Sequence, residues 1–124
     1  MAQAHQLIAD DGAVVIERCR VADRPHTRMR GLLGRTGLPA GEGLLLRPAP
    51  SIHTWFMRFP IDAVFLDRDL RVLALAPELP PWRVRRGASA VLELGAGEAR
   101  RRGIREGMVL TLGPATETAV DGAR

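Results

Sequence analysis

The sequence predicts a mainly β domain, a small β-sandwich or open barrel with one or two short helices. Many short runs of β-branched and aliphatic residues are separated by glycine, proline and aspartate turns, which is typical of compact all-β folds. A chain of 124 residues with 46% hydrophobic and 26% charged residues has the size and composition of one globular domain. We expect that domain at 13–113, between a flexible lead-in at 1–12 and a flexible tail at 114–124.

The expected strands follow from short apolar runs that are bounded by turn residues. They lie at 13–21, 43–49, 51–57, 62–66, 71–77, 89–94 and 107–112. The two runs on either side of 67–69 should pair as a hairpin, because Asp-Arg-Asp is a short polar turn. The segment 78–86 contains adjacent prolines and is expected to be a stiff connection.

Two segments show helical rather than β spacing. In the first, at 23–34, Asp23 can cap the helix, Pro25 suits its first turn and Gly34 can end it. We expect this helix to pack on the sheet. The second segment, at 95–103, begins with glycines and is long enough for one or two helical turns.

The charge pattern gives only weak support for a nucleic-acid partner. All 18 basic residues are arginines, whose very high pKa values raise the pI to 11.1 while the net charge is only +4. No apolar run approaches the ~20 residues that a membrane-spanning helix needs. The first residues lack the basic start and the apolar stretch of a signal peptide, so a cytoplasmic location is expected.

Several fragments in a fixed order resemble the bacterial and archaeal domain-of-unknown-function family 192. They are RGLLGR at 30–35, GLLL at 43–46, TWFMRFPIDAVFLD at 54–67, VLELGAG at 91–97 and the glycines at 103 and 107. The resemblance covers residues 12–113 and implies a mainly β, sandwich-type fold, with no established activity to carry over. Two positions depart from many members: Arg58-Phe59 replaces a Lys-Asn pair, and Met108 replaces an acidic residue.

The stretch from Ser51 to Asp62 is the strongest candidate for a functional site. It contains a histidine, an arginine, a tryptophan, two of the three phenylalanines and an aspartate. Binding pockets are mostly apolar with a few convergent polar groups, and this mixture fits that description. We predict a small binding or accessory module whose ligand-binding residues are His53, Trp55, Arg58 and Asp62. In the open alternative, the aromatic residues are core and Asp62 hydrogen-bonds a turn after Pro60.

A further alternative is an enzyme in which His53 and Asp62 form an acid–base pair. A histidine titrates near neutral pH, and a carboxylate can fix its tautomer. The two residues are separated in sequence, so their contact depends on strand pairing, and no nucleophile accompanies them. The catalytic residues are left unknown, and an enzyme is the less expected class.

A cluster of arginines in the C-terminal half supports a different function, the binding of RNA or a nucleotide. The arginines that would carry it are Arg83, Arg85, Arg86, Arg100, Arg101 and Arg102. They would form one basic patch only if the connection at 83–86 lies beside the turn at 100–105. The alternative is a solvated helix face, on which Glu98 pairs with Arg102 at i, i+4.

No metal or cofactor is expected. The histidines at 5, 26 and 53 lie in separate segments, and no His-x-His, Cys-x-x-Cys or His-Glu-x-x-His spacing occurs. Cys19 is the only cysteine and falls in an apolar strand, where we expect an inert core side chain. The expected partner is an unidentified small molecule or protein, with nucleic acid less favoured and no membrane.

Overall fold

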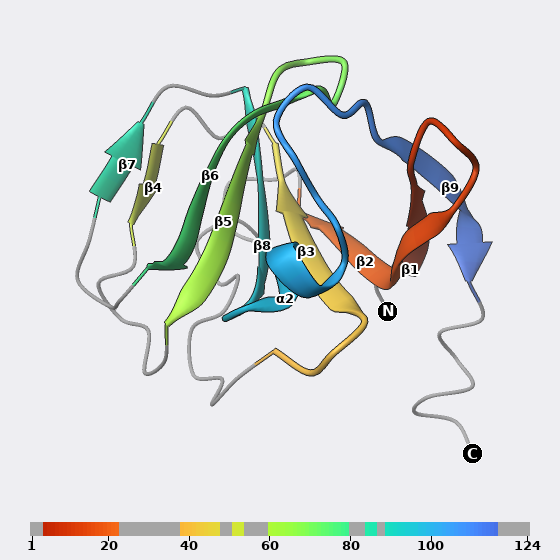
Figure 1. Cartoon of the computed structure of the whole chain (residues 1–124), viewed down its shortest axis with the longest axis horizontal. Coiled ribbons are helices and arrows are strands. Elements are labelled where there is room, and N and C mark those ends of the chain that lie inside the picture. The colour runs from red at the N-terminus through yellow and green to blue at the C-terminus, as the bar shows by residue number, and fades with distance from the viewer. Residues whose placement is uncertain are drawn as a thin grey trace.

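The computed structural model describes residues 4–22, 38–47, 51–53, 60–79, 84–86 and 89–116. Strands dominate this part of the chain, as the sequence predicts (Figure 1). They are β1 (Ala4–Ile8), β2 (Val14–Ala22), β3 (Glu42–Leu46), β4 (Ser51–His53), β5 (Ile61–Leu66), β6 (Val72–Leu79), β7 (Val84–Arg86), β8 (Ala90–Gly95) and β9 (Thr111–Thr116). The helix described, α2 (Glu98–Arg101), confirms the helical turn expected at 95–103. No helix in the described ranges is long and apolar enough to cross a bilayer.

Seven strands form one mixed sheet in the order β6-β5-β8-β3-β2-β1-β9, and β4 pairs with β7 separately. The pairs are antiparallel except β2 with β3, which run parallel. The expected hairpin is present as β5 and β6, and Asp67 Oδ1 accepts 2.9 Å hydrogen bonds from the backbone N–H groups of Asp69 and Arg71 in its turn. The mainly β prediction is confirmed. The described strands do not decide between the sandwich and the open barrel, because β6 and β9, the sheet edges, share no ladder.

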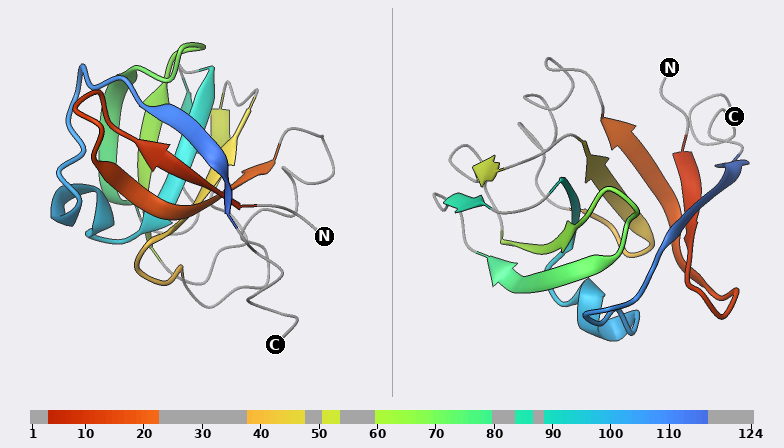
Figure 2. Two further views of the ribbon diagram at one scale, coloured as in Figure 1. Left: turned by 90° about the vertical axis from the view of Figure 1, so that its right-hand side faces the viewer. Right: turned by 90° about the horizontal axis from the view of Figure 1, so that it is seen from above.

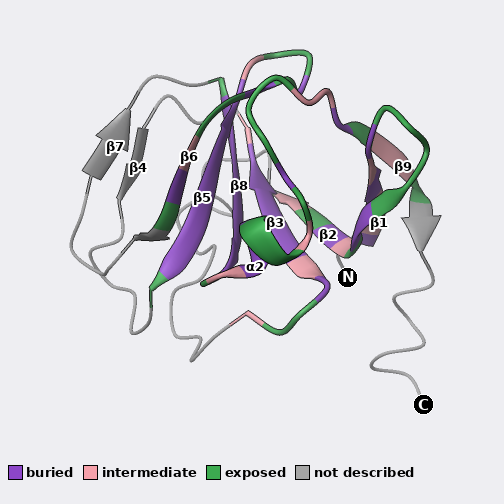
Figure 3. Ribbon diagram, viewed as in Figure 1, coloured by how far each residue is buried: buried purple, intermediate pink, exposed green. Residues whose placement is uncertain are grey.

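The sheet is strongly curved and therefore has a concave and a convex face (Figure 2). α2 lies on the concave side, and β4 and β7 lie on the convex side. The concave face packs a large apolar cluster that includes Leu45, Val64 and Leu92. The convex face carries a smaller cluster of buried side chains: Leu44, Leu46, Ile61, Ala63, Phe65, Ala76 and Val91. Because both faces are covered, β5 and β8 are buried along their whole length (Figure 3).

The N-terminus differs from the expected lead-in at 1–12. Ala4–Ile8 forms β1 between β2 and β9, and Leu7 is fully buried in the concave cluster. His5 Nδ1 lies 3.1 Å from the carbonyl oxygen of Gly113, so this side chain also links β1 to β9. The run AHQLI is poor in β-branched residues, so its strand conformation depends on pairing at both edges rather than on local propensity.

The last strand also starts and ends later than expected. β9 spans Thr111–Thr116, beyond the predicted domain end at 113. The residues before it instead contact the start of β6. Arg71 and Val109 form an isolated bridge, and the N–H of Leu110 donates to the carbonyl oxygen of Leu70 at 2.9 Å. This contact joins β6, at one edge of the sheet, to the segment that leads into β9 at the other.

Three expected segments lie partly or wholly outside the described residues. The strand predicted at 51–57 is present as β4 over 51–53, and 54–59 is not described. The connection predicted at 78–86 contains a short strand, β7, at its end. The helix predicted at 23–34 falls outside the described ranges.

Candidate functional site

Asp62 anchors the start of α2 from the neighbouring strand β5. Its Oδ1 accepts a 3.0 Å hydrogen bond from the N–H of Gly97, and its Oδ2 accepts one of 2.9 Å from the N–H of Ala99. Gly97 occupies the N-cap position with φ +86° and has no side chain to satisfy these donors. Asp62 is 1% exposed. The alternative in which this carboxylate hydrogen-bonds a turn fits the geometry, although the turn precedes α2 rather than following Pro60.

Glu98 extends this anchor into an ionic network on the concave side. Its Oε1 accepts hydrogen bonds from the N–H of Gly41 at 3.3 Å and from Nε of Arg102 at 3.1 Å. Its Oε2 pairs with Arg101, the residue one turn along. Arg102 also reaches Glu17 Oε1 at 2.6 Å, and this hydrogen bond raises the pKa of Arg102 above its ordinary value. The network ties α2 to β2 and to the chain just before β3.

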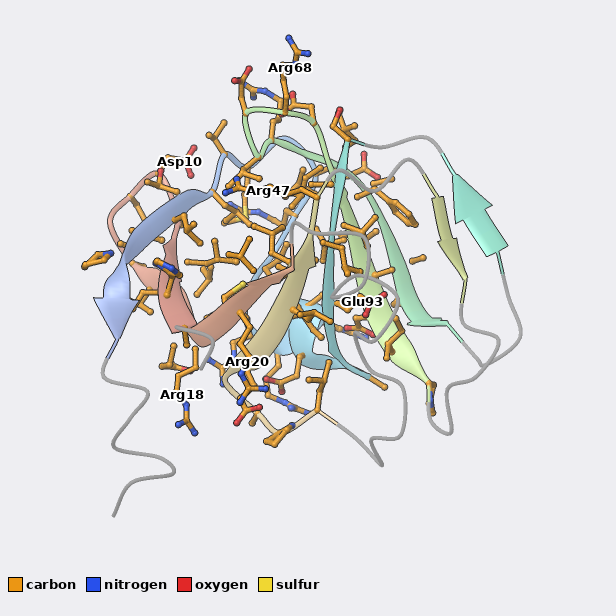
Figure 4. All side chains as sticks on the ribbon, turned by 180° about the vertical axis from the view of Figure 1, so that it is seen from behind. Asp10, Arg18, Arg20, Arg47, Arg68 and Glu93 are labelled. Atoms are coloured by element: carbon orange, nitrogen blue, oxygen red, sulfur yellow. The ribbon has the colours of Figure 1, made fainter. Side chains whose placement is uncertain are left out.

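Glu93 faces the opposite way, onto the convex side. It lies in β8 opposite Leu44 of β3 and Ala63 of β5, and it is 5% exposed. Within the described part of the chain its carboxyl group has neither a hydrogen bond nor an ion pair. Burial raises the pKa of Glu93 from 4.5 to about 7, because the charged form loses its hydration. Figure 4 views the sheet from this side, with Glu93 labelled.

The described neighbours of Glu93 on the sheet are apolar and include small side chains. Ala63 and Ala76 continue the same row across β5 and β6, and Phe65 and Val91 fill the next row. We call the following residues the convex site: Leu44, Ala63, Phe65, Ala76, Val91 and Glu93. An acid at the centre of such a surface carries a desolvation cost that the described residues do not offset.

Two features mark the borders of the convex site. At one end, the chain crosses the sheet so closely that a Cβ on Gly95 would lie 2.7 Å from the carbonyl oxygen of Leu38. At the β2 side, Arg18 and Glu42 form an ion pair of 3.4 Å. Arg20 is exposed and lies in the row of Glu93, with Leu44 between them.

The residues predicted to bind ligand are only partly placed. His53 ends β4, on the convex side of the sheet, and its side chain is not described; Trp55 and Arg58 lie outside the described residues. The carboxylate of Asp62 is on the concave side, at α2. The backbone of His53 and the carboxylate of Asp62 thus lie on different sides of the sheet, and a contact between the two side chains stays a prediction, because the side chain of His53 lies outside the described part. Among the described residues, Glu93 is the buried acid on the side of β4.

The sequence prediction does not single out Glu93, because this residue falls in the ordinary strand expected at 89–94. An alternating strand normally points its acidic residues to solvent, which gave no reason to single out Glu93. A signal was nevertheless present. Ala-Val-Leu-Glu-Leu-Gly at 90–95 is an almost continuous apolar run, which is typical of a strand buried on both faces. A lone acid within such a run must be buried as well.

The arginines predicted for nucleic-acid binding do not form one described patch. Arg85 and Arg86 belong to β7, of which the backbone is described, and Arg83 lies outside the described residues. Arg100, Arg101 and Arg102 lie in and after α2, on the other side of the sheet (Figures 1 and 2). Arg101 and Arg102 are paired with acids, whereas Arg100 is exposed.

Metal and thiol chemistry find no support in the described residues. Within the described ranges, no group of three or more His, Cys, Asp or Glu side chains could hold a metal ion. Cys19 is fully buried and free of any disulfide, and burial raises the pKa of its thiol to about 12. A thiol with this pKa is protonated at neutral pH, which agrees with the expected inert core side chain.

These features define a mainly β domain with a curved mixed sheet, a short helix anchored by a carboxylate, and a buried acid on the outer face. The chain belongs to the DUF192 family, described as an uncharacterized ACR, whose sequence profile matches residues 6–112. The resemblance read from the sequence fragments is thereby confirmed. No match was found among curated proteins.

Two solved structures are similar to this chain. A protein of unknown function from Novosphingobium aromaticivorans DSM 12444 is 26% identical with a TM-score of 0.72, over 87% of this chain and 83% of that chain. A "putative transcription regulator" from Sinorhizobium meliloti 1021 is 22% identical with a TM-score of 0.76, over 90% of this chain and 94% of that chain. The identity of the second is so low that its likeness supports the fold alone.

Proposed function

We propose that this domain is a small binding or accessory module whose ligand site lies on the convex face, with Glu93 as its central polar group. The observation that carries the proposal is a carboxyl group, 5% exposed, that lacks a partner in the described part of the chain. A buried carboxyl group without a partner lowers the free energy of unfolding. Proteins keep such destabilising groups mainly at functional sites.

The predicted ligand-binding residues enter this proposal with different roles. His53, Trp55 and Arg58 belong to the segment that begins with β4 on the convex side, and we propose that they complete the site around Glu93. Asp62 would contribute indirectly, because its two hydrogen bonds fix α2 against the far face of the same strands. The proposed partner is a small molecule or a short protein segment that binds beside the apolar residues of the convex face.

We further propose that the sheet forms an open barrel. The curvature of the sheet and the bridge between Arg71 and Val109 support an open barrel rather than a sandwich. In an open barrel the concave side is filled by the main apolar cluster, so we place the proposed site on the convex side, at the edge of the smaller buried cluster.

A thermal-shift screen tests the proposed site. Wild type and Glu93→Gln would be screened against amines, organic acids, sugars, nucleotides and metal ions, with Glu106→Gln as the control because Glu106 is exposed in a turn. A ligand at about a hundredfold excess over its Kd adds roughly 2.7 kcal/mol, or on the order of 10 °C. We expect a shift in wild type and Glu106→Gln that is absent in Glu93→Gln. A shift that Glu93→Gln retains would contradict the proposal.

The RNA- or nucleotide-binding alternative has less support from the geometry. Arg101 and Arg102 are already engaged with Glu98 and Glu17, and α2 and β7 lie on opposite sides of the sheet. The same screen at low and moderate salt distinguishes the two functions. Binding to phosphates releases their counterions, and this release becomes less favourable as the salt concentration rises, so affinity falls steeply with salt; binding at an apolar site responds weakly.

A further inference from the structure

We infer that residues 103–110, which we call the strap, open and close over the concave cluster as one unit. The strap runs from the end of α2 to the start of β9 and crosses the concave side of the sheet (Figure 1). Its far end is held on β6 by a small set of contacts, which we call the latch. The inference goes beyond the proposed function and does not depend on Glu93, which faces the convex side.

The latch consists of backbone hydrogen bonds between the start of β6 and the end of the strap. The N–H of Leu110 donates to the carbonyl oxygen of Leu70 at 2.9 Å. The N–H of Val72 donates to the carbonyl oxygen of Met108 at 2.7 Å, and the carbonyl oxygen of Val72 accepts a bond of 2.8 Å from the N–H of Gly107. Because these three bonds lie side by side, they should form and break together.

Few side chains of the strap are buried. Ile104 is 3% exposed and Leu110 is 2% exposed, and both belong to the concave cluster. Between them, Arg105, Glu106 and Gly107 are exposed. A segment with two buried anchors and mostly exposed residues is expected to open at a lower free energy than the core strands of the same protein.

The backbone of Leu70 opposes the closed latch. Among the described residues, Leu70 is the one non-glycine residue in the left-handed region, with φ +66°. This conformation is unfavourable for leucine, because the Cβ comes too close to a carbonyl oxygen. The side chain of Leu70 is 7% exposed in the concave cluster, so its packing and the bond from Leu110 hold the strained backbone in place. Opening the latch frees this turn to relax, which reduces the free-energy difference between the closed and open states.

Opening the strap changes what the molecule exposes without dismantling the sheet. The ladders of β6 with β5 and of β9 with β1 do not involve the strap, so they remain. The open state exposes Leu70, Val72 and Leu110 of the concave cluster, together with the backbone N–H and carbonyl group of Val72 at the edge of β6. The strap therefore controls access to one side of the concave cluster and to this part of the β6 edge.

Native-state hydrogen exchange, followed by NMR at pH 7, tests the opening directly. After correction for intrinsic rates, the amides of Val72, Gly107 and Leu110 should share one opening free energy. They should exchange at least about tenfold faster than the amides of Val64 in β5 and Leu92 in β8. Equal protection of all five amides, or three unrelated rates at the latch, would overturn the inference.

A disulfide across the latch makes the opening reversible by reduction. Arg71 and Val109 face each other between two of the latch bonds, which is the closely spaced, non-hydrogen-bonded position of an antiparallel pair and suits a disulfide. Cys19 is buried and should not compete for the crosslink. Because Arg71→Cys also removes the 3.1 Å bond from Arg71 Nη1 to the carbonyl oxygen of Gly107, the reduced form of the same double variant is the reference.

In the double variant Arg71→Cys with Val109→Cys, we expect oxidation to slow exchange at the latch amides by at least about tenfold relative to the amides of β5. Reduction should restore the faster exchange. If the ratio of latch to β5 exchange is the same in the oxidised and reduced forms, the strap does not open as a unit and the inference is wrong.

Two substitutions at Leu70 test the contribution of strain. Leu70→Ala and Leu70→Gly both remove the buried side chain, but glycine adopts a positive φ without strain. The latch amides should therefore exchange about fivefold more slowly in Leu70→Gly than in Leu70→Ala. Equal or faster exchange in Leu70→Gly would contradict the release of strain on opening.

Discussion

Asp62 and Glu93 lie within one residue of being directly opposite on β5 and β8, yet their carboxyl groups meet contrasting environments. Asp62 pairs with Leu94 in the ladder, and Ala63 pairs with Glu93, so the two acids project to opposite faces. Asp62 accepts two backbone hydrogen bonds, whereas Glu93 has none from the described residues. The first acid stabilises the fold, and the second costs stability.

The first prediction concerns the pH dependence of stability at Glu93. Its pKa in the folded state, about 7, lies above the ordinary 4.5, so the folded protein holds an extra proton between these values. Unfolding stability should then fall as the pH rises from about 4.5 to about 7, by roughly 3 kcal/mol for the full shift. Urea unfolding of Glu93→Gln should lack this decline relative to wild type.

At pH 8, Glu93→Gln should consequently be more stable than wild type by about 1–3 kcal/mol, because an amide is less costly to bury than a carboxylate. Glu106→Gln, at an exposed position, should change stability by no more than about 0.5 kcal/mol. Parallel stability curves for wild type and Glu93→Gln from pH 4.5 to 8 would show that the carboxyl group is compensated by residues beyond the described ranges.

The second prediction concerns the reactivity of Cys19. Its thiol is fully buried and has a pKa of about 12, so the nucleophilic thiolate is essentially absent at pH 8. A chromogenic disulfide reagent should therefore not react with the native protein, and it should titrate one thiol per chain in concentrated guanidinium chloride. Rapid labelling of the native protein would mean that β2 opens readily.

Among the elements, those with a continuous apolar run were predictable from sequence. β2, β5 and β8 match the expected strands closely, because their residues are buried whichever neighbour they meet. β1 was missed because its strand conformation depends on β2 and β9, which lie far away in sequence. β7 was missed because the prolines before it favour a connection.

The candidate site was less predictable than the fold. The sequence directed attention to the segment of His53 and Trp55, which begins on the convex side, but it also assigned Asp62 to the same pocket. Period-two alternation gives the face of a residue only relative to its own strand. The break at Pro60 removes the common reference, so the opposite placement of Asp62 could not be read from spacing.

The third prediction tests the anchoring of α2 by Asp62. In Asp62→Asn, one of the two acceptor oxygens becomes a donor, so the N–H of Gly97 or Ala99 loses its partner in a buried position. We expect a loss of about 2 kcal/mol in urea unfolding, with faster hydrogen exchange at these two amides. Asp69→Asn, an exposed acid in the β5–β6 turn, should be nearly neutral. Unchanged exchange at both amides would show that α2 is held by Glu98 instead.

At the scale of the whole molecule, the open sheet leaves two edges that need protection against pairing with other chains. Among the described strands, β6 and β9 are those edges, and each contains an exposed proline, Pro77 in β6 and Pro114 in β9. Proline has no backbone N–H and cannot continue a hydrogen-bonded ladder with a further strand. The prolines therefore limit edge-to-edge association while leaving the bridge at Arg71 and Val109 intact.

The last prediction follows from this protection of the edges. A variant with both Pro77→Val and Pro114→Val regains two backbone donors and two residues that favour strands, so it should associate more strongly than wild type. Sedimentation velocity at increasing concentration should show a rising average mass for the variant and a smaller rise, or none, for wild type. Thr111→Val is the matched control, because it adds an apolar side chain to β9 without freeing an N–H. Equal masses for all three proteins would mean that the edges are protected by means other than proline.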